Sequence, residues 1–187
     1  MTHRSILIAV TAVLVACVGG TPPAGAGDRS ARDLVVTFDR VADVPALEAR
    51  VLTQINLLRR AQRLAPLRAN PALAAAAREQ SLSMAEHGFF GHESFGGSPF
   101  WKRVESKYTR LPTDASWRVG ENLVWRSPRI SARGAVELWL GSPPHRENLL
   151  RQAWREVGIS AVHASAAPGV YAGHDVTILT VDFGVRR

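Results

Sequence analysis

Residues 156–184, EVGISAVHASAAPGVYAGHDVTILTVDFG, decide the fold class of this 187-residue chain. Two runs rich in β-branched residues, EVGISAVHAS and VYAGHDVTILTVDFG, flank the short segment AAPG. Valine, isoleucine and threonine favour strands, and a segment with Gly and Pro between two such runs favours a turn. The pattern therefore predicts two antiparallel strands that form a hairpin near the end of the chain.

Helices are predicted before this hairpin. Apolar residues recur at three- and four-residue intervals through residues 45–62: Leu47, Val51, Ile55 and Leu58. Asn70 is a favourable N-cap for a second helix over residues 71–87, which Gly88 ends, and the face of that helix expected to be buried carries four residues: Leu73, Ala77, Ser81 and Met84.

Three shorter helices are predicted over residues 98–107, 130–142 and 143–150, and the second of them is expected to bury Ala135, Leu138 and Trp139. Helices followed by a terminal hairpin indicate an α+β domain, or a layered α/β/α one.

The composition indicates a globular domain without a nucleic-acid partner. The apolar fraction is 46%, the charged fraction is 21%, and the formal net charge is +7. The basic residues are almost all arginines that are scattered among acids, with no basic run of five or more. A nucleic-acid surface would concentrate such charge on one stretch or face. We expect a single domain that is a monomer.

Residues 1–26 are typical of a secretory signal, with Arg4 before a short apolar run and small residues after it. Two processing sites compete. The first, AGA at residues 24–26, fits signal peptidase cleavage, and the second, LVAC, would make Cys17 a lipidated first residue. We favour lipidation of Cys17 and hence membrane attachment, with residues 27–44 as a tether and residues 45–187 as the domain. In either case the protein is exported, to the extracellular space, the periplasm or a membrane-anchored position.

Two of the six histidines are candidate site residues, because His92 and His145 each lie where a loop meets a helix. Glu121, in an otherwise apolar stretch, is a carboxylate that needs a partner when buried. Two imidazoles and one carboxylate suit a divalent cation such as zinc, yet the spacing is not diagnostic, and structural hydrogen bonding explains the same residues. Ser142 is expected to cap the last short helix, and no acid is placed to orient a Ser–His pair.

From Val51 to Phe183 the sequence resembles the CAP superfamily of cysteine-rich secretory, antigen 5 and pathogenesis-related proteins, in particular its bacterial SCP-like extracellular branch. The resemblance rests on a shared order of motifs: Asn56, Arg59, Leu64, Pro66 and Leu67 in the first helix and the link after it, LAAAAREQSLSMAEHGFFGH, GEN at residues 120–122, AVELWLGSPPHRENLL, and EVGIS. It implies a three-layer α-β-α sandwich with a central antiparallel sheet and one shallow cleft.

Many members of the superfamily line that cleft with two histidines and two acidic residues associated with divalent metal binding. The resemblance carries three of these positions to His92, Glu121 and His145, whereas Ser142 stands where the second glutamate would be. It therefore implies a weak cation site, with Ser142 and Asn122 supporting the cleft. A lipid, sterol or peptide ligand is implied by resemblance alone.

Two main functional hypotheses follow. The first is a non-catalytic exported binding module with a weak divalent-metal cleft. The alternative is a hydrolase, most plausibly a peptidase, that uses metal-activated water or Ser142 as nucleophile and Glu121 or a histidine as base. A third interpretation gives the cleft residues a structural role only.

Overall fold

The structure is a computed structural model that describes residues 40–108 and 116–186. The expected signal peptide, Cys17 and most of the expected tether lie outside these residues. The described helices are α1 Pro45–Ala61, α2 Pro71–His87, α3 Phe100–Tyr108, α4 Ala132–Leu140 and α5 Pro143–Leu150, with a short 3-10 turn at Gly169–Tyr171. The described strands are β1 Val41–Asp43, β2 Arg68–Ala69, β3 Trp117–Arg126, β4 Glu156–Ala164 and β5 Val176–Arg186.

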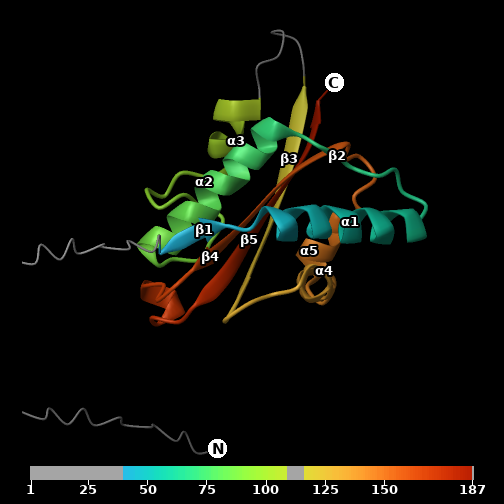
Figure 1. Ribbon diagram of the computed structural model, residues 1–187. Helices are drawn as coiled ribbons and strands as arrows, with labels where there is room; N and C mark the ends of the chain where they lie inside the picture. Colours follow the sequence, from blue (N-terminus) through green and yellow to red (C-terminus); the bar gives the residue numbers. More distant parts are fainter. Residues whose placement is uncertain (1–39, 109–115, 187) are drawn as a thin grey trace, which may run out of the picture. The chain divides into compact units, whose positions relative to one another are not determined.

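The sheet lies between two helical layers (Figure 1). Its strand order is β1-β4-β5-β3, and every neighbouring pair in that order is antiparallel. The two-residue strand β2 pairs with the beginning of β4 and is parallel to it. Helices α1, α4 and α5 cover one face of the sheet, and α2 and α3 cover the other. The predicted α+β three-layer sandwich is confirmed.

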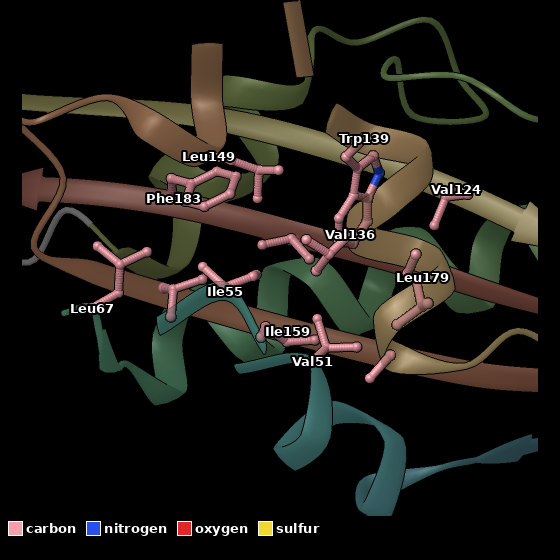
Figure 2. Close-up of a cluster of buried hydrophobic side chains, with 14 of the residues drawn as sticks. Val51, Ile55, Leu67, Val124, Val136, Trp139, Leu149, Ile159, Leu179 and Phe183 are labelled. Atoms are coloured by element: carbon pink, nitrogen blue, oxygen red, sulfur yellow. The ribbon is translucent and has the colours of Figure 1, made fainter. Parts of the chain in front are cut away.

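The larger core lies between the sheet and the layer that contains α1 and α4 (Figure 2). Trp139 is almost fully buried there, and its indole nitrogen donates to the Leu123 carbonyl at 2.9 Å. The predicted stripe of the first helix is buried at Leu47, Val51 and Ile55. Leu58 is only half-buried, because the next residue, Arg59, takes the inward position.

Arg59 is fully buried because its guanidinium satisfies carbonyl groups of the chain. It donates to the carbonyls of Ala65 and Leu149, at 3.0 and 2.8 Å. Asn56 makes a reciprocal pair of hydrogen bonds with the backbone of Leu67. These two side chains fix the link after α1 and join it to α5.

Helix α2 packs directly on β4. Asn70 caps it by accepting from the amides of Ala72 and Leu73, as predicted. Its four predicted inward residues are all buried. At Gly158 of β4 the helix backbone comes so close that an added Cβ would lie 2.0 Å from the carbonyl carbon of Leu73. Only glycine permits this contact.

The structure differs from the sequence predictions at three places. Residues 41–43, assigned to the tether, form β1 because they pair with Val162–Ala164 of β4. Residues 117–126, where the sequence patterns predict no element, form β3. Leu138, which was expected to be buried, is 44% exposed. It lies on the solvent-facing side of α4, whereas Trp139 points into the core.

Candidate functional site

His92, Glu121 and His145 lie together at the β3 edge of the sheet. His92 is in the loop after α2, Glu121 is in β3, and His145 is in α5. The Nδ1 atom of His92 lies 2.8 Å from Oε1 of Glu121, and the ring centroids of the two histidines are 6.5 Å apart. The structure therefore brings together three groups that are far apart in sequence.

Glu121 is a buried carboxylate with two partners. A carboxylate only accepts hydrogen bonds, so Nδ1 of His92 carries the proton and donates to it. Its other oxygen accepts from a terminal nitrogen of Arg103, which comes from α3. The side chains of Glu121 and Arg103 are only 1% and 2% exposed, whereas that of His92 is 50% exposed. Glu121 thus orients the imidazole of His92 through Nδ1, and no hydrogen bond to Nε2 is found among the described residues.

Gln80 positions the loop that carries His92. Its amide nitrogen donates to the carbonyls of Gly91 and Glu93, at 2.6 and 3.0 Å, on either side of the histidine. Its amide oxygen accepts from Arg103 at 2.8 Å. One buried network therefore fixes both the carboxylate and the histidine loop.

Two asparagines connect α5 to β3. Asn122 donates to the main-chain carbonyl of His145 at 3.0 Å. Asn148 donates to the carbonyl of Glu121 and to the side-chain oxygen of Asn122, at 3.1 and 3.0 Å. Asn122 therefore joins β3 to the backbone of α5 at His145, and its role in supporting a cleft stays a prediction. Ser142 occupies the N-cap position of α5, but its hydroxyl makes no capping hydrogen bond, so the expected capping role is wrong.

Burial and nearby charge affect two further groups. Burial, together with the proximity of His92, lowers the pKa of His145 below its ordinary value of 6.5, which favours a neutral imidazole. Asp182 lies directly opposite Glu121 in the β3–β5 register and is fully buried. Burial and the neighbouring Glu121 raise the pKa of Asp182 well above its ordinary value, so its protonated form is favoured.

The side chains of His92, Glu121 and His145 offer a cation fewer ligands than the resemblance implies. Within residues 40–108 and 116–186, no group of three or more His, Cys, Asp or Glu side chains is arranged so that it could hold a metal ion. Glu121 uses both oxygens on protein partners, so we place it behind His92 rather than at a metal. A carboxylate that accepts the second N–H of a ligating histidine is a common arrangement in metal sites. Two imidazoles, those of His92 and His145, remain as candidate ligands.

The arrangement does not favour Glu121 as a general base. A general base needs a lone pair that faces the cleft, whereas both oxygens of Glu121 are committed inside the domain. For Ser142, the described part of the chain shows no hydrogen bond to a histidine. No specific observation supports the peptidase alternative.

Sequence reasoning did not identify Gln80, Arg103, Asn148 and Asp182 as parts of this network. A signal existed for Asp182, because a carboxylate inside the apolar run TVDFG is unusual in a strand covered on both faces. Nothing in the spacing distinguishes Arg103 from the many exposed arginines.

The three-layer sandwich indicates the class of protein. The model of the CAP group, described as the cysteine-rich secretory protein family, matches residues 52–183, and the chain belongs to this family. A comparison with curated protein sequences gives no match.

Two solved bacterial structures have a similar fold. An outer surface protein from Borrelia burgdorferi is 21% identical, with a TM-score of 0.61, over 78% of this chain and 98% of that one. An extracellular protein with an SCP domain from Bacillus anthracis is also 21% identical, with a TM-score of 0.54, over 72% of this chain and 40% of that one. At this identity the comparison establishes the fold alone.

Proposed function

We propose that this chain is an exported, non-catalytic CAP domain whose cleft binds a divalent cation such as zinc weakly, through His92 and His145. One observation carries the proposal: the two imidazole rings lie near each other, tilted at 54° with centroids 6.5 Å apart, and Glu121 orients one of them. Two histidines on one zinc ion would have centroids roughly 5–6 Å apart, given Zn–N distances of about 2.0–2.1 Å. The two side chains would have to move slightly closer together to share one ion.

Weak binding follows from the ligand count. Structural zinc sites have four protein ligands and catalytic sites have three, whereas this cleft offers two and leaves the remaining positions to water. The lowered pKa of His145 supports binding, because metal ions need a neutral imidazole.

Export is supported by the signal-like N-terminus and by the bacterial relatives, whose names describe outer-surface and extracellular proteins. In the described part of the chain, no helix has both the length and the apolarity that a bilayer crossing requires. Attachment through Cys17 and a lipid, sterol or peptide ligand stay predictions.

Zinc titration by calorimetry tests the cation site. We expect His92→Ala and His145→Ala each to abolish measurable binding, and Glu121→Gln to weaken it by about 10–100-fold, as for other residues that orient metal ligands. His174→Ala is the matched control, because His174 is exposed and is not in the cleft.

Wild-type affinity in both cleft variants would exclude the site. Thermal melts of each variant separate lost binding from lost folding. A peptide library incubated with and without chelator distinguishes the classes, and chelator-sensitive turnover that Glu121→Gln abolishes would favour the hydrolase instead.

A further inference from the structure

A cavity lies between α1 and α4, two helices on the same face of the sheet that are neighbours in Figure 1. Its volume is about 590 Å³, within the range of small-molecule sites. Three arginines line it, Arg50 from α1, Arg129 from the preceding loop and Arg133 from α4, and no acidic residue lines it. It shares no residue with the histidine cleft.

The arginines of this cavity are largely uncompensated. Arg50 and Arg129 have no ion pair among the described residues. Arg133 pairs with Glu137 at 2.8 Å, but the two side chains are 82% and 59% exposed. Such exposed pairs contribute little stability, so an anionic ligand can displace Glu137 and bind the guanidinium of Arg133. Of the three guanidinium groups in the cavity, only that of Arg133 therefore has an ion-pair partner among the described residues, and this partner is exposed.

The first turn of α4 adds donors at the same place. Ser131 caps the helix by accepting from the amide of Gly134 at 3.0 Å, and its carbonyl accepts from Ala135. The amides of Ala132 and Arg133 are left without an acceptor in the described part of the chain. Unpaired amides at the start of a helix favour an anion.

The inner wall of the cavity is apolar. Leu47, Ile130 and Ala132 line it and are 4%, 8% and 6% exposed, and Val44 lies beside them. Cationic groups above an apolar wall match a ligand that has an anionic group on a small apolar body. The planar forks of guanidinium groups suit an anion with several equivalent oxygens, which favours phosphate.

We propose that this α1–α4 cavity is a binding site for an organic phosphate, held by Arg50, Arg129 and Arg133, with the apolar part of the ligand against Leu47 and Ile130. The phosphate can belong to a soluble phosphomonoester or to a phospholipid headgroup. This site is independent of the cation cleft and does not require it to function.

Two binding assays on the full chain distinguish the sources. Calorimetry with glycerol 1-phosphate tests a soluble ligand, and cosedimentation with phosphatidylglycerol vesicles, compared with phosphatidylcholine vesicles, tests a headgroup. We expect binding in at least one assay, and Arg50→Gln/Arg129→Gln to weaken it by about tenfold or more, because each removed arginine loses charge-assisted hydrogen bonds.

Arg60→Gln/Arg63→Gln is the matched control. It removes the same amount of positive charge, but from two exposed arginines that do not line the cavity. Arg60 lies near the C-terminal end of α1, and Arg63 lies in the link that follows. The N-terminal segment is unchanged. We expect it to leave binding within about twofold of wild type. Equal loss in the two double variants would show non-specific attraction and overturn the proposal, as would binding in neither assay.

Discussion

Glu121 shows how one residue joins the fold to the cleft. Its carboxylate is buried, and Arg103 is the charged partner on its inner side. Removing one partner of a buried ion pair leaves the other charge without compensation. We expect Arg103→Met to lower the free energy of unfolding by about 3–5 kcal/mol, measured by denaturant titration at neutral pH.

The double variant Arg103→Met/Glu121→Gln provides the control for this effect. It removes both charges, so no bare carboxylate stays in the interior, and much of the lost stability should return. Equal instability of the single and double variants would show that packing of the Arg103 side chain, rather than charge, is what the substitution disturbs.

Replacing Asp182 is expected to raise the stability of the domain, whereas replacing Arg103 is expected to lower it. It is fully buried, no donor among the described residues reaches its carboxyl oxygens, and its pKa is raised well above 3.8. At neutral pH the unfolded chain ionises this group freely whereas the folded domain resists ionisation, so Asp182 lowers stability.

An amide at this position keeps the shape and a hydrogen-bond donor toward Glu121. We expect Asp182→Asn to raise the midpoint of thermal unfolding at pH 7. A lower midpoint would mean that Asp182 is ionised and compensated in the folded domain.

At the scale of elements, α2 and β4 are in contact through their backbones. An alanine at position 158 would place its Cβ 2.0 Å from the Leu73 carbonyl carbon and 2.1 Å from the Ala74 nitrogen. Backbone atoms of a helix cannot move aside individually, so the two elements must separate.

We expect Gly158→Ala to lower the free energy of unfolding by about 3 kcal/mol or more, at the upper end of overpacking effects. The control is Gly96→Ala, because a Cβ there meets nothing within 4 Å. Near-wild-type stability of Gly158→Ala in denaturant titration would show that α2 shifts easily over β4.

The elements that the sequence predicts best are those with one buried face. Helices α1 and α2 have polar outer sides, so their apolar residues recur with a helical period. Strand β3 lies between two helical layers, and its central residues are buried on both faces. It therefore lacks the alternation that signals a strand, and its polar GEN segment interrupts the apolar run.

The candidate site forms only when several helices and strands of the domain pack together. Its groups come from the loop after α2, from α3, β3 and α5, and from the β5 residue opposite Glu121. The sequence predicted that His92, Glu121 and His145 would converge because the resemblance aligned them. It could not identify Arg103 as the partner of Glu121, because that pairing exists only once α3 packs over the sheet.

The pH dependence of stability also belongs to the whole domain, since half-buried His145 and fully buried Asp182 act in opposite directions. The pKa of His145 is lowered below 6.5 by burial and by His92. As the pH falls below about 6.5, the unfolded chain takes up this proton and the folded domain does not, so stability decreases until the folded pKa is reached. Asp182, with its raised pKa, increases stability as the pH falls toward 3.8.

Two substitutions separate these contributions in thermal melts between pH 7 and pH 5. We expect His145→Gln to lose part of the acid-induced decrease in melting temperature, because the unfolded chain no longer gains that proton. Asp182→Asn should show a steeper decrease than wild type, because it lacks the opposing contribution. His174→Gln, which changes an exposed histidine, should follow wild type. If His145→Gln and wild type gave parallel curves, burial of the α5 imidazole would contribute nothing to the acid sensitivity of the domain.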